Sequence, residues 1–295
     1  MTSNPVAPRT RTGPAAPFAV PPDRPGPVLE LRGVHVVWER ELIRFLRNRL
    51  RIVTSLVQPI LFLFVLGTGL SRLGPATGGY DYRTFVFPGI VAMTVMFTAI
   101  FSAVSIVWDR EFGFLREMLV APVSRTSLVV GKILGGATVA TLQGLLILAF
   151  AGAVGIPYSP ALLAVLVGLM LLAALVITAI GVLIASGIHQ MEAFQAVLQF
   201  VAMPMFFLSG AMFPLTGLPA WLHGLTVLDP LTYVVDPMRR AVLAAIGTPP
   251  ALMARLAPGV SWGDWIVPTG VEMALLVALA VLAAAVAVRR FGHTD

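Results

Sequence analysis

The sequence has no cysteine and little charge, and both absences narrow what the chain can be. Without cysteine there is no disulfide framework, no thiolate metal site and no cysteine nucleophile. Only 12% of the 295 residues are Asp, Glu, Lys or Arg, whereas 58% are hydrophobic. The charges gather in short stretches between long uncharged runs, and a water-soluble surface needs charge spread throughout the chain. The composition therefore indicates an integral membrane protein whose loops carry the charge.

The sequence also lacks the motifs of a nucleotide-binding protein or an enzyme. Its only Gly-Lys pair, Gly131-Lys132, is followed by Ile, so the motif Gly-x-x-x-x-Gly-Lys-Ser/Thr is absent. The four histidines are far apart, and the sequence has no Asp-rich cluster and no serine-nucleophile motif. We expect no catalytic residue, no metal site and no cofactor in this chain. We also expect no nucleic-acid partner despite the net charge of +6, because basic residues of a membrane protein set its topology.

Six runs with almost no charge are long enough to cross a bilayer, which takes about 20 apolar residues. The stretch 215–263 is apolar only in short pieces broken by Pro and Asp, so we expect short helices there that lie at or re-enter the membrane. The sequence thus predicts an all-α membrane protein with six transmembrane helices in one permease domain, 52–291. The expected spans are about 52–71, 85–107, 128–152, 161–187, 194–213 and 265–288.

The basic residues predict the orientation of the chain. Fifteen of the twenty precede the first span, lie in or near the loop between the second and third spans, or follow the last span. By the positive-inside rule both termini are cytoplasmic, and we expect a multi-pass protein of a bacterial plasma (inner) membrane. Residues 1–28 contain eight prolines and predict a disordered cytoplasmic tail, and 292–295 form a second short tail.

The segment 29–51 predicts an amphipathic helix that connects the tail to the first span. Trp38, Leu42 and Phe45 gather on one face, and four arginines share the other. We expect the apolar face to enter the acyl boundary and the arginines to meet anionic headgroups, so that membrane lipid is a partner. The alternative is a basic flank that only sets the topology. The four residues are Arg40, Arg44, Arg47 and Arg51.

The loop between the second and third spans has the highest charge density of any internal segment. Phe112, Leu115 and Leu119 are spaced three and four apart, as one face of a helix requires, and Pro122 ends the element. The sequence therefore predicts a short amphipathic helix, and such a helix can pass the motion of a docked cytoplasmic domain to the two spans.

Two stretches resemble the type-2 ATP-binding-cassette exporter permeases, a group that includes daunorubicin-resistance permeases and nodulation-factor or polysaccharide exporters. With the six-span layout the resemblance covers nearly all of residues 29–291, although Phe114 stands where a smaller residue is common. The first stretch is Glu111-Phe-Gly-Phe-Leu-Arg-Glu117-Met-Leu with Ala-Pro-Val-Ser-Arg125. The second contains Phe207-Leu-Ser-Gly-Ala-Met-Phe-Pro214, Leu218-Pro-Ala-Trp-Leu222 and Asp229-Pro-Leu-Thr-Tyr-Val-Val-Asp236-Pro-Met-Arg-Arg240.

The resemblance implies a permease subunit that moves a lipophilic drug-like or lipid-linked substrate outward. It implies a separate ATP-binding-cassette ATPase that binds ATP and Mg, two permease copies in a homodimer or heterodimer, a connecting helix, a coupling helix and re-entrant helices before the last span. The alternatives are a polysaccharide or glycolipid exporter of the same family, an ion-coupled secondary transporter and a membrane scaffold. The residues expected to contact the ATPase are Glu111, Phe112, Leu115, Arg116, Glu117 and Leu119.

Flexible, aromatic and amide side chains in the second and fifth spans are the candidates for the substrate pathway. Such side chains suit a lipophilic passenger, and ordinary helix packing is the alternative. Glu272 in the last span is costly to ionise in lipid, so we expect it to pair with Arg239 or Arg240, with a substrate or proton role as the alternative. The pathway candidates are Met93, Phe97, Phe101, Gln195, Gln199, Met203, Phe206 and Phe207.

Overall fold

The computed structural model describes residues 26–71, 81–111 and 124–291. Within these ranges the chain is mostly helical, and six helical stretches are long and apolar enough to cross a membrane. The mostly helical architecture and the number of spans expected from the hydropathy pattern are therefore confirmed. The six stretches are Arg49–Ser71, Tyr82–Glu111, Arg125–Leu148, Pro160–Ser186, Met191–Leu208 and Thr269–Phe291.

The first two spans each contain more than one helical segment. In the first span α2 (Arg49–Leu61), a π-helical turn (Phe62–Leu66) and α3 (Gly67–Ser71) follow one another without a break. In the second span Ala103 separates α4 (Tyr82–Ser102) from α5 (Val104–Glu111). The other four spans are single helices: α7 (Arg125–Leu148), α8 (Pro160–Ser186), α9 (Met191–Leu208) and α13 (Thr269–Phe291).

The last span begins at Thr269, not at the expected Trp265. Trp265 belongs to a hairpin in which β1 (Ser261–Trp262) pairs antiparallel with β2 (Trp265–Ile266). The turn between the strands contains Gly263 at a φ of 65°, a conformation that glycine adopts without steric cost. Hydropathy cannot separate these apolar strand residues from the helix that follows them.

The third and fifth spans end earlier than expected. α7 stops at Leu148, and a 3-10 turn (Ala151–Val154) then leads to Gly155 at a φ of 77°. α9 covers Met191–Leu208 and is followed by Gly210 at a φ of 70°. In both places a glycine in the left-handed conformation turns the chain within an uncharged stretch. Composition does not show such a turn, so the expected spans continued to 152 and 213.

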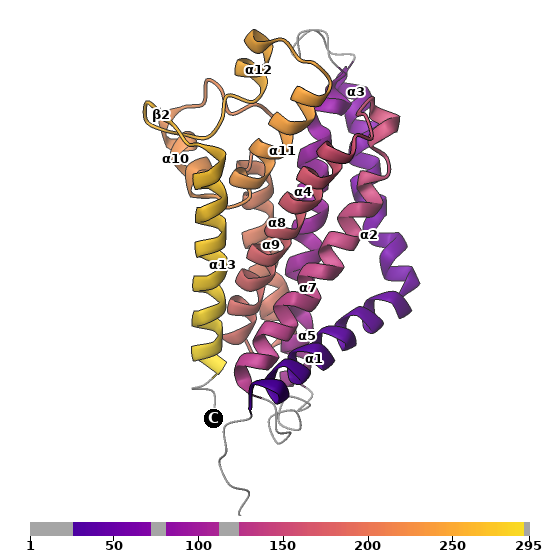
Figure 1. Ribbon diagram of the computed structural model, residues 1–295, viewed down its shortest axis with the longest axis vertical. Coiled ribbons are helices and arrows are strands. Elements are labelled where there is room, and N and C mark those ends of the chain that lie inside the picture. Colours follow the sequence, from indigo (N-terminus) through magenta and orange to yellow (C-terminus); the bar gives the residue numbers. More distant parts are fainter. Residues whose placement is uncertain (1–25, 72–80, 112–123, 292–295) are drawn as a thin grey trace, which may run out of the picture.

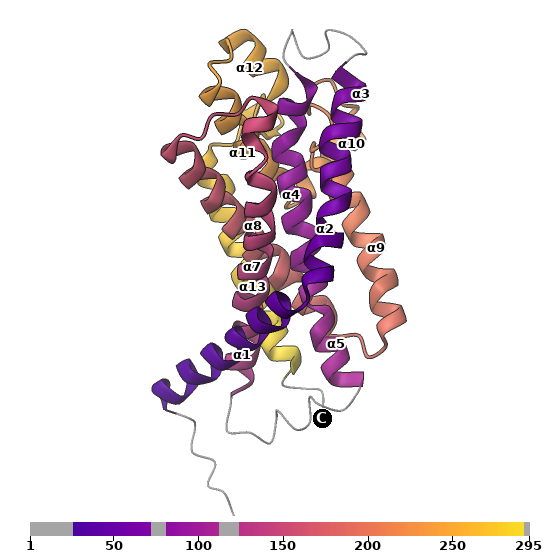
Figure 2. The ribbon, with the colours of Figure 1, turned by 90° about the vertical axis from the view of Figure 1, so that its right-hand side faces the viewer.

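α4, α7 and α8 form the centre of the bundle, and α2, α9 and α13 lie at its periphery (Figures 1 and 2). Small residues let the central helices approach closely. A Cβ added at Gly136 of α7 would collide with Ser102 of α4 and Thr178 of α8. Close contact between small residues is the usual basis of helix association in membranes, where apolar burial gives little driving force.

The bundle has two ends that differ in structure. We call the end that carries α1 and the last residue of α13 the proximal end, and the opposite end the distal end (Figure 1). The distal end carries the hairpin and three short helices, which agree with the short helices expected in 215–263. They are α10 (Ala220–Leu228), α11 (Thr232–Ala245) and α12 (Pro250–Leu256).

The connecting helix α1 (Pro27–Arg47) crosses the proximal end obliquely (Figure 2). It ends four residues before the expected boundary at 51. Asn48 leaves the helical conformation, and its side-chain oxygen accepts a hydrogen bond from the Arg51 N–H at 3.0 Å, which starts α2. Arg51 therefore belongs to the first span and not to the connecting helix.

Candidate functional site

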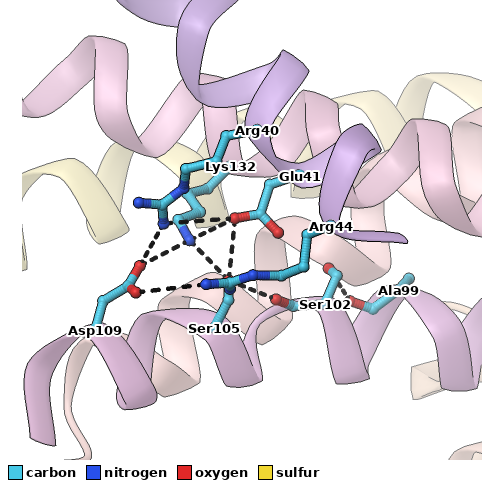
Figure 3. A network of polar contacts seen from close by, with 8 residues as sticks. All are labelled: Arg40, Glu41, Arg44, Ala99, Ser102, Ser105, Asp109 and Lys132. Carbon is cyan, nitrogen blue, oxygen red and sulfur yellow. Dashed lines mark hydrogen bonds and ion pairs between the residues drawn. The ribbon is translucent and has the colours of Figure 1, made fainter. Parts of the chain in front are cut away.

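A buried ionic cluster lies where α1 crosses α5 and α7 (Figure 3). The ammonium of Lys132 donates to Glu41 Oε1 at 2.7 Å, to Ser105 Oγ at 2.7 Å and to Asp109 Oδ2 at 3.1 Å. Lys132, Glu41 and Asp109 are each buried. Arg40 completes what we call the lysine cluster, because its Nη2 donates to Asp109 Oδ2 at 2.7 Å.

Each carboxylate of the lysine cluster lies beside a cation. Lys132 and Arg40 face Glu41 and Asp109, and the half-exposed Arg44 places a further guanidinium 4.0 Å from Asp109. A buried charge without a partner is strongly destabilising, so this arrangement holds only while all three helices stay together. The lysine cluster therefore acts as a polar joint between α1, α5 and α7.

Two glycines on α7 create the space that α1 occupies. A Cβ added at Gly131 would lie 2.7 Å from Val37 Cβ, and one added at Gly135 would lie 2.8 Å from Glu41 Cβ. The two glycines are four positions apart, so they lie on one face of α7 and form a groove along it. α1 is thereby brought close enough for Glu41 to reach Lys132.

Two residues of α1 make contacts within the protein besides the lipid contacts expected of this helix. The indole Nε1 of Trp38 donates to Thr138 Oγ1 of α7 at 3.0 Å. The partly exposed Arg40 binds Asp109. The amphipathic pattern of 29–51 identified the two faces, and it could not reveal that a protein surface covers part of the helix.

The proximal end of α5 is fixed to its neighbours as well. Glu111 Oε2 accepts from the Met191 N–H at 3.2 Å, and Arg110 Nη1 donates to the carbonyls of Ser186 at 3.0 Å and Ile188 at 3.2 Å. These contacts tie α5 to the turn between α8 and α9. The remaining residues expected to contact an ATPase lie outside the described residues: Phe112, Leu115, Arg116, Glu117 and Leu119.

The pathway candidates do not gather in one place within a single chain. Met93 is buried in the core, and Phe206 is buried against Phe62 of the first span, with ring centroids 6.3 Å apart. Phe97 is partly buried and stacks on Phe101. The others point outward from the bundle: Phe101, Gln195, Gln199, Met203 and Phe207.

At the distal end Arg239 is held by the main chain. Its Nη2 donates to the carbonyls of Gly210 at 2.7 Å and Ala211 at 3.0 Å, its Nε donates to the Phe85 carbonyl at 3.3 Å, and its guanidinium lies 4.0 Å from the Phe85 ring centroid. Burial lowers the pKa of Arg239 to about 10, so the group stays charged at neutral pH.

The neighbouring Arg240 bridges two carboxylates. Its Nη2 donates to Glu272 Oε2 at 2.7 Å, and its Nε lies 2.7 Å from Asp236 Oδ2. The pairing expected for Glu272 is therefore present, with Arg240 as the partner. Nearby, Asp229 is buried and accepts the Leu231 N–H at 2.9 Å, and burial raises the pKa of Asp229 to about 8.

Sequence reasoning missed the lysine cluster. It counted Lys132 only among the basic residues near a loop, and it assigned no role to Glu41 or Asp109. One signal was available, because Lys132 is the only lysine of the chain and follows Gly131 inside a run that is otherwise apolar. Its partners come from segments 23 and 91 residues away, and periodicity within one segment cannot connect them.

Comparison with known proteins places this geometry in a family. The family model described as "ABC-2 type transporter" matches residues 32–243, which include all members of the lysine cluster. The chain is 30% identical to nodulation protein J of Rhizobium leguminosarum bv. viciae over 210 residues, 70% of this chain and 81% of that protein. It is 27% identical to the inner membrane transport permease YadH of Escherichia coli (strain K12) over 219 residues, 72% of this chain and 84% of that protein.

A third relative shares a shorter region. The "Probable multidrug ABC transporter permease YbhR" of Escherichia coli (strain K12) is 34% identical over 159 residues, 53% of this chain and 43% of that protein. The family match extends from α1 to α11 and thus covers five of the six candidate spans. Together with the six apolar helices, it shows that the chain belongs to the ABC-2 type transporter family and is a multi-pass membrane permease.

Proposed function

We propose that this chain is the transmembrane subunit of an ATP-driven exporter and that a separate ATP-binding-cassette ATPase supplies the work. Membership of the ABC-2 family implies an ABC ATPase partner, and the sequence has no phosphate-binding motif of its own. The observation that carries the proposal is the lysine cluster, which joins α1 to the two helices that flank residues 112–123.

The proximal end is the face on which the ATPase docks in this proposal, and it is cytoplasmic. Phe112, Leu115 and Leu119 fill a cleft of the ATPase as apolar anchors, and Glu111, Arg116 and Glu117 pair at the rim. Buried anchors dominate such contacts, and charges at the rim contribute little. Motion of the loop then reaches α5 and α7 from both sides, and the lysine cluster makes α1 move with them.

The transported substrate is a lipophilic drug-like or lipid-linked molecule that passes between two copies of the chain. The exposed residues of α9 support this arrangement. Phe200, Met203 and Phe207 point away from the bundle and are not covered by other described parts of the chain. The word "multidrug" in the name of the YbhR relative agrees with a lipophilic cargo. Pairing of two identical copies, in a bacterial inner membrane with both termini cytoplasmic, completes the proposal.

The ion-coupled alternative is less well supported. The charged side chains buried in the described spans are paired with opposite charges in the lysine cluster and at Glu272. A secondary transporter requires ionisable groups that bind and release an ion during the cycle.

The test is Leu115→Asp in the permease reconstituted with its ATPase in liposomes. A charge in the apolar anchor should abolish transport and the stimulation of ATP hydrolysis, while the permease remains inserted. Glu117→Lys is the matched control at the rim and should be milder, because exposed charge pairs contribute about 0–1 kcal/mol. Transport and stimulation that survive Leu115→Asp in a correctly inserted protein would contradict the coupling role. Transport without any ATPase would overturn the proposed function.

A further inference from the structure

A cavity opens on the outside of the bundle at its distal end, between α8, α11 and α13. Its volume is about 460 Å³, within the range of about 300–1,000 Å³ that ligand sites occupy. Val165, Gly168 and Leu169 of α8 form one apolar wall, and Met273 of α13 forms another. A Cβ added at Gly168 would meet no atom within 4 Å, so the wall is open where the glycine lies.

Arg240 gives this cavity a charged end. Its side chain is 27% exposed and lines the cavity, whereas the two carboxylates that it binds, Asp236 and Glu272, are buried behind it. Carboxylates accept but do not donate hydrogen bonds, so the donors left on the cavity side are those of the guanidinium and the hydroxyl of Thr269.

The local charge does not oppose an anion at this end. Two carboxylates surround Arg240, but the positive charge of Arg239 also acts on Asp236. Two cations thus balance two anions, and the member that faces the cavity is a cation. A ligand that places a negative group beside Arg240 therefore meets a guanidinium first, with donors suited to phosphate oxygens.

The polar and apolar parts of the cavity follow the order found in a lipid leaflet. Thr269 begins α13, and Glu272 lies in its first turn, so the charged end lies where the last span leaves the membrane. Leu169 lies nine residues after Pro160, the first residue of α8. The apolar wall therefore extends up to about 13 Å from that end of α8 toward its middle. A phosphate at the rim and an acyl chain below it match this order.

We propose that this cavity is a binding site for an anionic phospholipid of the surrounding bilayer. Its phosphate pairs with Arg240 and Thr269, and one acyl chain lies along Val165, Gly168, Leu169 and Met273. A lipid with a net negative charge binds better than a zwitterionic one, because the cationic headgroup of the latter is repelled by the guanidinium. The bound lipid would lie against α8, α11 and α13 on the outside of the bundle.

The experiment uses the full chain in nanodiscs of phosphatidylcholine that contain a photoreactive lipid with a diazirine on its acyl chain. Phosphatidylglycerol and phosphatidylcholine versions of this probe are compared, and the labelled residues are mapped by mass spectrometry. We expect the anionic probe to label 164–169 and 269–273 about fivefold more than the zwitterionic probe, the effect of about one favourable charge pair. The exposed residues Leu61 and Val65 of the first span, farther from the arginines of 40–51, serve as the reference, where both probes should label equally.

Two variants separate specific binding from ordinary lipid contact. Arg240→Gln combined with Glu272→Gln removes both charges but allows an amide hydrogen bond, and it should abolish the preference for the anionic probe. Val165→Trp fills the cavity without changing a charge and should reduce labelling of 164–169 by both probes. Val281→Trp, on an exposed face of α13 away from the cavity, is the matched control and should change neither.

Three outcomes would overturn the site. Equal labelling of the cavity by the two probes in the wild type would mean that lipid contacts it only as it contacts the rest of the surface. A preference that persists after the double substitution would mean that Arg240 does not recognise the headgroup. Unchanged labelling in Val165→Trp, which keeps every charge and does not depend on the stability of the double variant, would mean that the acyl chain lies elsewhere.

Discussion

The two ends of the bundle both bury charged side chains, but they hold them with different partners. At the proximal end Lys132 is held by side chains from α1 and α5, while at the distal end Arg239 is held largely by main-chain carbonyls of Phe85, Gly210 and Ala211. The proximal contacts therefore depend on side chains from three helices staying together, whereas the distal contacts depend on the course of the main chain near Phe85 and Gly210. The comparison indicates a joint made by side chains at the proximal end and an anchor made by the main chain at the distal end.

The sharpest test of this difference is to remove the distal anchor. Arg239→Met would leave three carbonyls without their donor in a buried site and would lose the contact with the Phe85 ring. We expect the free energy of unfolding to fall by about 4 kcal/mol, since hydrogen bonds to a charged group contribute about 1.5–3 kcal/mol each. Unfolding in detergent, followed by a chaotrope titration, measures the change. Arg255→Met, at an exposed distal arginine, is the control and should have little effect. A stable Arg239→Met protein would remove the distinction between the two ends.

The proximal joint should respond in two separable ways. Lys132→Met removes the cation that binds Glu41 and Asp109 most directly from within the bundle, and we expect a loss of about 3 kcal/mol in stability together with loss of ATPase stimulation. Adding Glu41→Gln removes the carboxylate that has lost its closest cation, so stability should recover in part while stimulation stays low. The exposed Arg49→Met is the control for loss of a cation at this end. Normal stimulation in a folded Lys132→Met protein would show that the cluster only stabilises the fold.

A third test concerns pH at the distal end. Because the pKa of Asp229 is about 8 in the folded chain, well above its unfolded value, the folded state holds a proton that the unfolded state releases. The stabilisation of the folded chain by this bound proton is complete below the unfolded pKa of Asp229. It is lost as the pH rises through the folded pKa. We expect Asp229 to lower the stability by about 2 kcal/mol between pH 6 and pH 8. Asp229→Asn keeps an acceptor for the Leu231 N–H and should remove this slope in unfolding measurements at the two pH values. An identical slope in the variant would assign it to another group.

The smallest expected effect comes from the groove that receives α1. Gly131→Ala would force a methyl group against Val37, at a cost of about 1 kcal/mol and with weaker ATPase stimulation. Gly69→Ala is the matched control, because a Cβ there meets no atom within 4 Å. Thermal unfolding and ATPase assays on the two variants measure the difference. Equal behaviour of the two variants would mean that α1 does not need the groove.

The sequence predicted the number of spans because crossing a membrane depends on length and composition, which are properties of one segment. It also located the short distal helices, where Pro and Asp divide the apolar runs. The break at Asn48 and the hairpin before α13 were not predicted, because each depends on the conformation of one or two residues. The lysine cluster and the outward position of α9 depend on which helices become neighbours. Such contacts between distant segments leave no periodic signal.

The π-helical turn at Phe62–Leu66 changes the rotation of the first span about its own axis. A π-turn contains more residues than an α-turn, so α3 is rotated relative to the course that α2 would have taken. On the proximal side of the turn Ser55 accepts a hydrogen bond from Gln143 of α7, whereas Gly67 on the distal side packs against Arg83 of α4. The span thus meets α7 on one side of the π-turn and α4 on the other. A single-residue deletion within the turn would restore regular winding and would rotate Gly67 relative to Ser55, so that the contact with Arg83 or the one with Gln143 should weaken.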